Sequence, residues 1–241
     1  MKALIIAAGR GSRFLQEMRE KPKPLLLVSG IPLIERIIGY VKRAGITEII
    51  IVTGYLGHKI REHLGNGEKF GVSVEYIHND EWGKKNGISV LKAKAGLLEP
   101  FFVLMSDHLF DYTIIEKMKK APLGTEEVML AVDYNLTSEL VDLEDVTRVR
   151  TAGQQIEDIG KNITPFNAFD TGIFFCSPAL FAALEEGMVN GDSSLTDGMK
   201  VLAKRKKAKV FEIENKYWID VDTREYLEKA EKIIREHKLP F

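Results

Sequence analysis

A turn rich in glycine and positive charge follows a short apolar run near the N-terminus, and Lys23 comes after it. The turn and its entry read Ala7, Ala8, Gly9, Arg10, Gly11, Ser12 and Arg13. Glycine frees the backbone to turn sharply and to approach a ligand closely. Backbone N–H groups in such a turn converge on an anion, and arginine and lysine add fixed positive charge beside it. The pattern therefore predicts a cradle for a polyphosphate at the end of the first strand.

Carboxylates stand near the ends of two further apolar runs. Asp107 follows the run at 101–105, while Asp220 and Asp222 lie two residues apart near the C-terminus. Open α/β sheets place ligands at the carboxyl ends of strands, and Mg²⁺ takes carboxylate oxygens together with substrate phosphates. These residues are therefore candidate ligands of Mg²⁺ or Mn²⁺. Asp220 and Asp222 share a strand face, and the position of Asp222 at the strand end favours it.

Each carboxylate also has a structural alternative. Asp107 could cap the next turn, and Asp222 could be the N-cap of the last helix. His108, beside Asp107, is as compatible with a structural role as with a catalytic one.

Two well-known phosphate loops do not fit this chain. A dinucleotide fingerprint needs a third glycine where Phe14 stands, and a P-loop needs a Gly-Lys-Ser/Thr triplet, which does not follow. No nucleophile–base pair is evident either. A cradle, separated carboxylates and lysines suit phosphoryl-type transfer, in which the protein positions the reactants and neutralises charge.

The composition indicates a globular protein of one domain, residues 1–241. The chain carries a formal net charge of −1 and one cysteine, Cys176, inside an apolar run. Near-balanced charge argues against nucleic acid or a membrane surface as a general partner, and a disulfide within the chain is impossible. No apolar run is long enough to span a bilayer, so we expect a cytoplasmic protein without a signal peptide. Scarce glutamine beside abundant Lys, Glu and Arg is typical of a thermophilic source.

Strands and helices alternate through the first half of the chain. After the N-terminal run, apolar segments predict strands at 48–53, 72–78, 101–105 and 128–132. Helical spacing predicts helices at 32–44, 57–64, 88–98 and 112–120. Such alternation implies an α/β fold with a mostly parallel, Rossmann-like mixed sheet flanked by helices.

The second half is less regular. A hairpin is expected at 147–158, turning at Ala152-Gly153. Further strands are expected at 172–176, 210–214 and 217–221. Helices are expected at 179–186, 195–206 and 224–237.

The N-terminal motif resembles a known family signature. Nucleotidyltransferases that activate sugar and alcohol phosphates carry the signature Ala-Ala-Gly-x-Gly-x-Arg followed by Pro-Lys-Pro-Leu. Residues 7–13 of this chain resemble the first half of that signature, and Pro22-Lys23-Pro24-Leu25 resembles the second half. The resemblance covers essentially the whole chain and implies a nucleotide-binding first half and an acceptor-binding second half. It implies that an acceptor phosphate attacks the α-phosphorus of a nucleoside triphosphate, with Arg13, Lys23 and Asp107 as catalytic residues.

The same resemblance assigns further contacts. Asn86, Gly87 and Ser89 match a turn that contacts the nucleotide beside the cradle. Lys161, Asp170 and Gly172 match positions that contact the acceptor. Each also has an ordinary interpretation, since a lone lysine is often solvated and a glycine turn often only begins a strand.

The substrates follow from resemblance alone. Ser106-Asp107-His108 and the segment at 218–223 look most like cytidylyltransferases that make CDP-alcohols, which implies CTP and inositol-1-phosphate. Some such enzymes are fused to a membrane CDP-alcohol transferase, so the chain is either a stand-alone form or an excised domain. Sugar-1-phosphate thymidylyl- or uridylyltransferase, phosphocholine cytidylyltransferase and a non-catalytic nucleotide sensor remain alternatives. The oligomeric state stays open.

Overall fold

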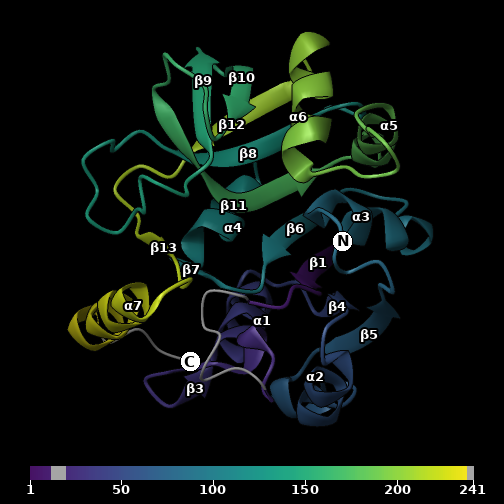
Figure 1. Cartoon of the computed structure of the whole chain (residues 1–241), viewed down its shortest axis with the longest axis vertical. Coiled ribbons are helices and arrows are strands. Elements are labelled where there is room, and N and C mark those ends of the chain that lie inside the picture. The colour runs from purple at the N-terminus through teal and green to yellow at the C-terminus, as the bar shows by residue number, and fades with distance from the viewer. Residues whose placement is uncertain (12–19, 238–241) are drawn as a thin grey trace.

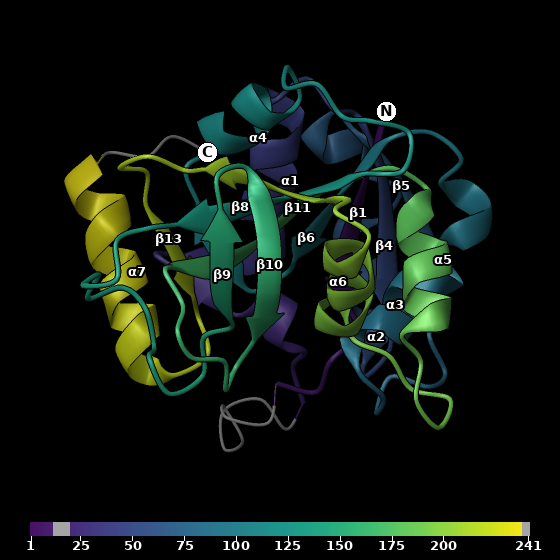
Figure 2. The same cartoon turned by 90° about the horizontal axis from the view of Figure 1, so that it is seen from above.

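The computed structural model of the chain describes residues 1–11 and 20–237, so the predicted Ser12 and Arg13 lie outside the described residues. The described residues form one nine-stranded sheet with helices on both faces (Figures 1 and 2). The strand order across it is β5-β4-β1-β6-β11-β8-β12-β10-β9. In chain order these strands are β1 (Lys2–Ala7), β4 (Glu48–Thr53), β5 (Ser73–His78), β6 (Phe101–Met105), β8 (Val128–Asp133), β9 (Arg148–Ala152), β10 (Gln155–Gly160), β11 (Ala168–Cys176) and β12 (Ala208–Glu212).

The sheet is mixed but mostly of one direction. Strands β5, β4, β1 and β6 are parallel neighbours, as the alternating first half predicts. Strand β11 runs antiparallel between β6 and β8, and β10 runs antiparallel between β12 and β9. All other strands of this sheet point the same way. The predicted mostly parallel mixed sheet flanked by helices is therefore confirmed.

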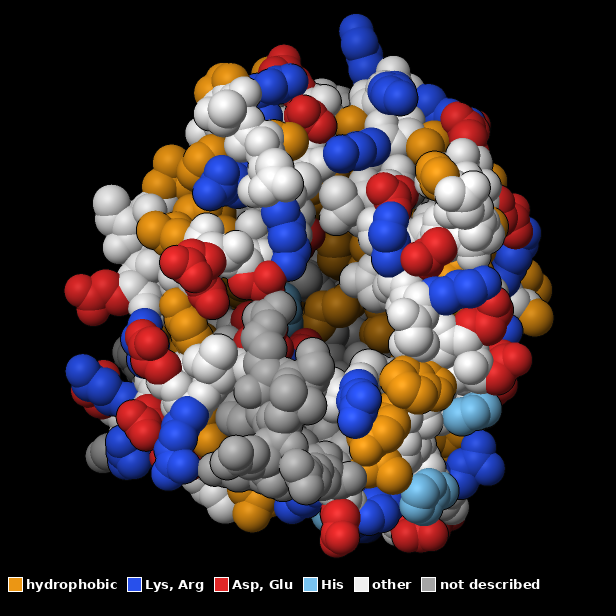
Figure 3. Space-filling view, in the orientation of Figure 1, with side chains coloured by type: hydrophobic (Ala, Val, Ile, Leu, Met, Phe, Trp, Pro, Cys, Tyr) orange, Lys and Arg blue, Asp and Glu red, His pale blue; other side chains and the backbone are white. Residues whose placement is uncertain are grey.

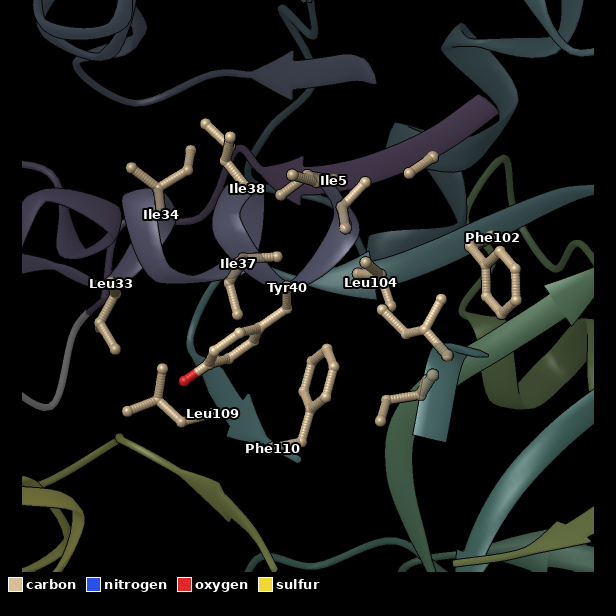
Figure 4. Close-up of a cluster of buried hydrophobic side chains, with 14 of the residues drawn as sticks. Ile5, Leu33, Ile34, Ile37, Ile38, Tyr40, Phe102, Leu104, Leu109 and Phe110 are labelled. Carbon is tan, nitrogen blue, oxygen red and sulfur yellow. The ribbon is translucent and has the colours of Figure 1, made fainter. Parts of the chain in front are cut away.

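Two hydrophobic cores lie on opposite faces of the sheet. One is covered by α1 (Leu33–Arg43), α2 (Gly57–Leu64), α4 (Thr113–Met118) and α7 (Arg224–His237). The other is covered by α3 (Asn86–Lys92), α5 (Ala179–Glu186) and α6 (Leu195–Lys204). Figure 4 shows α1 directing Leu33, Ile37 and Tyr40 toward Leu109 and Phe110. Burial of this apolar stripe fixes the helix against the sheet.

Short elements complete the fold, and a few predicted boundaries differ from the observed ones. A two-stranded sheet joins β7 (His108–Phe110) to β13 (Trp218–Asp220), and another joins β2 (Leu27–Val28) to β3 (Ile31–Pro32). The sequence did not predict β7. The helix expected at 88–98 ends at Lys92 and continues as a 3₁₀ turn, Lys94–Gly96. The strand expected at 210–214 lies at 208–212, where it pairs in parallel with β8.

The part of the chain that the structure describes contains no helix that is both long and apolar enough to cross a membrane.

Candidate active site

Two cavities meet at the carboxyl ends of β1 and β6. Figure 3 shows this face hollowed near its middle, with hydrophobic side chains at the bottom and charged ones around the rim. The first cavity is lined mainly by the N-terminal half of the chain, and the second mainly by the C-terminal half. Asn86, Met105 and Asp222 line both. A ligand in one cavity therefore lies next to a ligand in the other.

Lys23 stands among three carboxylates where the cavities meet. Its Nζ atom donates to Asp107 Oδ2 at 2.6 Å and to Asp222 Oδ1, and lies 3.6 Å from Asp220 Oδ1. Burial on its own lowers the pKa of Lys23, but the three negative charges outweigh it and raise that pKa above its ordinary value. Burial and the charge of Asp220 raise the pKa of Asp222, against the lowering effect of Lys23. Lys23 therefore stays protonated and holds the carboxylates together.

The local backbone explains why the lysine reaches this point. Lys23 begins a 3₁₀ turn, Lys23–Leu25, and Leu25 is buried in the core. Gly11 has φ +64°, and a Cβ atom there would lie 2.8 Å from Lys23 Cβ. A side chain at position 11 would displace the lysine, so the glycine of the predicted cradle is needed for packing as well as for the turn.

The carboxylates come from the ribbon, our name for the two-stranded sheet of β7 and β13 together with Asp107, Val221 and Asp222 at its end. The backbone N–H of Val221 donates to the Asp107 carbonyl oxygen at 3.0 Å, and Asp220 pairs with His108. The side chain of Asp222 contacts Lys23, whereas Thr223 Oγ1 accepts from the Tyr226 N–H at the start of α7. The helix-cap alternative for Asp222 is therefore not supported.

His108 links the ribbon to β11. Its Nδ1 donates to the Thr171 carbonyl oxygen at 2.8 Å, and Nε2 lies 3.5 Å from Asp220 Oδ2. Burial alone lowers the pKa of His108, but the charge of Asp220 and its hydrogen bond outweigh burial, and the pKa rises to about 10. Gly172 has φ +76°, and a Cβ atom there would lie 2.4 Å from His108 Nδ1. The predicted glycine thus makes room for the imidazole.

The donor set fits a divalent metal ion. Asp145, Asp220 and Asp222 offer carboxylate oxygens that lie within 4.8 Å of one another, and Asp107 and Asp220 do so beside His108, whose raised pKa makes it a cation and not a ligand. Carboxylate oxygens are the ligands that Mg²⁺ and Mn²⁺ prefer. The lysine ammonium among these oxygens shows that the position attracts positive charge.

The first cavity brings together most residues that were predicted to contact a nucleotide. Ala8, Gly9, Gly11, Lys23, Asn86 and Ser89 all line it. Ala7 is buried at the end of β1, and the Arg10 guanidinium lies 5.6 Å from the centre of the Tyr55 ring. Gly87 does not line this cavity and instead packs closely against the backbone of Ser193, whose carbonyl oxygen would lie 2.5 Å from a Cβ atom at position 87.

Sequence reasoning missed Trp82 as a lining residue of the first cavity and left Lys84 as a solvated charge. The ring of Trp82 lies 5.5 Å from that of Tyr55, in a loop whose chemistry no spacing rule singled out. Lys84 also lines this cavity, while it pairs with Glu81.

The second cavity brings together the residues that were predicted to contact an acceptor. Lys161, Asp170 and Gly172 line it, and Lys161 forms an ion pair with Asp145. Asp170 Oδ1 accepts from the Gly172 N–H at 2.8 Å, and burial raises the pKa of Asp170 to about 6. Sequence reasoning missed further lining residues, among them Leu140, Asp142, Asp145, Thr147 and Tyr226. The run of acidic residues at 139–145 was the only available signal.

Comparisons with known proteins agree with this geometry. A family model described as "Nucleotidyl transferase" matches residues 2–237. The chain is 32% identical over 234 residues to a "Bifunctional IPC transferase and DIPP synthase" of Aquifex aeolicus, covering 96% of this chain and 51% of that protein. It is 32% identical over 123 residues, 51% of this chain and 19% of that protein, to a "CMP-5'-(3-aminopropyl)phosphonate synthase" of Streptomyces rubellomurinus.

Among solved structures, the "inositol-1-phosphate CTP transferase from T. maritima" superimposes with a TM-score of 0.84 at 25% identity, covering 98% of this chain and 96% of that one. The chain spans about half the length of the first curated relatives that it matches. The family model matches nearly the whole chain, so this protein belongs to the nucleotidyl transferase family.

Proposed function

We propose that this nucleotidyltransferase moves CMP from CTP to inositol-1-phosphate, forming CDP-inositol and pyrophosphate with Mg²⁺ or Mn²⁺ bound. The observation that carries the proposal is Lys23 among three aspartates, at the place where the two cavities meet. A reaction between two bound phosphates needs positive charge at their junction, and here Lys23 supplies one charge while the three carboxylates could hold a divalent cation that supplies more. The printed names of the relatives from Aquifex aeolicus and T. maritima support the choice of substrates.

In this proposal the first cavity binds the nucleotide. Backbone N–H groups around Gly9 and Gly11, with Arg13, hold the β- and γ-phosphates, and the turn at Asn86 and Ser89 lies beside the base. Asp107 and Asp222, with Asp220, would hold a divalent metal ion. When bound, that ion would supply positive charge to neutralise the substrate phosphates.

The chain's own residues then position an in-line displacement. An oxygen of the acceptor phosphate donates its electron pair to the α-phosphorus, and the bond from that phosphorus to pyrophosphate breaks, with the electrons leaving on pyrophosphate. Lys23 stabilises the charge that grows in the transition state. A phosphate monoester is already anionic, so no general base is required and the absence of an evident nucleophile–base pair is consistent with the mechanism.

The second cavity suits a polyol. Besides Asp220 and Asp222, its carboxylates are Asp142, Asp145 and Asp170, which are hydrogen-bond acceptors for the hydroxyl donors of an inositol ring. Lys161 is a cation of the same cavity and adds donors for a hydroxyl or phosphate oxygen. In this assignment the N-terminal half binds nucleotide and the C-terminal half binds the acceptor, within one domain of residues 1–241.

A second acceptor class has a specific observation in its favour. The carboxylates of the second cavity stand with the aromatic side chains of Trp218 and Tyr226, and this combination also suits an ammonium group. The relative from Streptomyces rubellomurinus carries an aminoalkyl phosphonate in its printed name. Phosphocholine or an aminoalkyl phosphate is therefore the alternative acceptor.

A substrate matrix tests the assignment. Purified protein is given each nucleoside triphosphate with inositol-1-phosphate, glucose-1-phosphate, phosphocholine or 3-aminopropyl phosphonate, and pyrophosphate release is followed. We expect the highest kcat/KM with CTP and inositol-1-phosphate. Lys23→Ala and Asp107→Ala should each lower turnover by about 10²–10³-fold, because each removes charge that acts on the transition state.

The other outcomes are equally informative. Preference for an ammonium-bearing acceptor selects the second class. A preference for dTTP or UTP with glucose-1-phosphate rejects both acceptors and keeps the family chemistry. Tight nucleotide binding without turnover of any pair points to a nucleotide sensor.

A further inference from the structure

Asp133 is a buried carboxylate that the proposed reaction does not use. It is the last residue of β8 and is 5% exposed. Both of its oxygens have partners, since Oδ1 accepts from the Asn135 N–H at 2.8 Å and Oδ2 accepts from Trp218 Nε1 at 2.9 Å. A buried carboxylate is costly unless its oxygens are paired, so this arrangement is held strongly.

Trp218 connects this carboxylate to the ribbon. It is the first residue of β13 and pairs with Phe110 of β7, while Asp220 at the other end of β13 pairs with His108. Trp218 and Asp220 are two residues apart on one strand, so their side chains lie on the same face. A shift of the indole therefore moves β13, which carries Asp220 and is followed two residues later by Asp222.

The ribbon is short and depends on such links. It has only three residue pairs and forms a sheet of its own beside the nine-stranded one (Figure 1). On β7 it is linked to β11 through His108 and the Thr171 carbonyl oxygen, and the Thr171 hydroxyl in turn donates to the Ala131 carbonyl oxygen of β8. On β13 the corresponding link is the indole hydrogen bond to Asp133. Leu109, Phe110 and Ile219 are buried in the core that α1 covers and hold the ribbon in place, while the two side-chain links fix it to β8 and β11.

We propose that Asp133 is a positioning residue that fixes the metal-binding carboxylates of β13 through its hydrogen bond to Trp218. Asp133 lines neither cavity of the site. This inference rests on the proposed use of Asp220 and Asp222 as metal ligands. Partners one step removed from a metal ligand commonly change metal affinity by about 10–100-fold when they are mutated, and an effect passed through a backbone strand belongs at the lower end.

Two variants break the link from its two sides. In Asp133→Asn only one oxygen remains for two N–H donors, so either Asn135 or Trp218 loses its acceptor. Trp218→Phe keeps an aromatic ring but removes the donor. Tyr134→Phe is the matched control, because Tyr134 adjoins Asp133 yet its hydroxyl bonds to Thr151 Oγ1 at 3.0 Å, toward β9 and away from the ribbon.

Mn²⁺ binding to the whole chain, measured by calorimetry without substrates, is the deciding readout. We expect Asp133→Asn and Trp218→Phe each to weaken Mn²⁺ binding about 10-fold, and Tyr134→Phe to leave it unchanged. The double variant should bind Mn²⁺ about as weakly as either single variant, because both remove one interaction. Unchanged Mn²⁺ affinity in both single variants, at temperatures where each is folded by circular dichroism, overturns the proposal.

A second measurement follows Trp218 itself. The chain has two tryptophans, so Trp82→Phe leaves Trp218 as the only indole fluorophore. In that background Asp133→Asn should make the fluorescence more accessible to acrylamide. If accessibility rises while Mn²⁺ affinity stays the same, the bond is only structural and the proposal is wrong. If Mn²⁺ affinity falls as expected but no substrate pair turns over, Asp133 positions the site and the proposed function is what fails.

Discussion

Removing the ammonium of Lys23 should destabilise the protein strongly and in a pH-dependent way. In Lys23→Met a side chain of similar length remains, but the carboxylates lose their common cation. Deleting one partner of a buried ion pair costs about 3–5 kcal/mol. Asp107, Asp220 and Asp222 are 28%, 30% and 21% exposed, so solvent screens part of their repulsion and we expect about 3 kcal/mol. For a chain of this size that corresponds to a fall in Tm of about 6–12 °C.

The pH dependence has a definite sign. In the wild type, burial and the charge of Asp220 raise the folded-state pKa of Asp222 above its ordinary value, and Lys23 opposes this rise, so without Lys23 the pKa of Asp222 rises further above its unfolded value. A carboxyl group with a raised folded pKa contributes stability at low pH that is lost as the pH rises. The deficit of Lys23→Met relative to wild type should therefore be larger at pH 8 than at pH 5, since Lys23 in the wild type stays protonated throughout this range.

Thermal unfolding by circular dichroism, with chelator present, checks both expectations. The matched control is Lys161→Met, which removes an exposed lysine paired with Asp145 in the second cavity. An exposed ion pair contributes about 0–1 kcal/mol, so this variant should lose at most a few degrees. Equal shifts in the two variants, or a larger deficit of Lys23→Met at pH 5 than at pH 8, would refute the electrostatic account of Lys23.

Three further predictions concern the ribbon and β11. Gly172→Ala should cost about 2–3 kcal/mol in urea unfolding, because the backbone has φ +76° and the new Cβ meets His108 Nδ1. Burial raises the pKa of Asp170 to about 6, so its carboxyl group contributes stability while protonated and loses that contribution as the pH rises. Asp170→Asn removes this titration and should flatten the pH dependence of stability between pH 4 and 7. Asp222→Asn should raise the Mg²⁺ concentration needed for half-maximal activity more than Asp220→Asn does, because Asp222 lines both cavities. If wild type and both variants need the same Mg²⁺ concentration, neither residue belongs to the metal site.

Local patterns in the sequence predicted the architecture well. The parallel direction of β1, β4, β5 and β6 followed from the alternation of apolar runs and helices. Helix α1 lies nearly where its apolar spacing indicated. The errors fell where tertiary contacts override local preference. The strand expected at 210–214 shifted to pair with β8, and β7 is too short to be recognised without its partner β13.

The site was predictable to the extent that its residues lie in one motif or at a strand end. Lys23, Asp107 and Asp222 come together as the cradle and the strand ends suggested. Asp142 and Asp145 of the second cavity were not found, because the segment at 139–145 has no regular element and no spacing that marks it as a site. Arg13 and Ser12 lie outside the described residues and remain predictions.

The ribbon shows why spacing could not reveal how the site is held. Asp107 and Asp222 are 115 positions apart in the sequence (222 − 107), yet a three-pair antiparallel ribbon and one hydrogen bond from Val221 bring them to the same lysine. The bonds that fix the ribbon to the sheet join residues 63 and 85 positions apart, and each ends on a strand of the large sheet. Pairings at such separations are set by topology, so they leave no period in the sequence. Because β8 and β11 are buried in the sheet, linking the ribbon to them gives a short element, whose apolar side chains already pack in the core, the precision that a metal site requires.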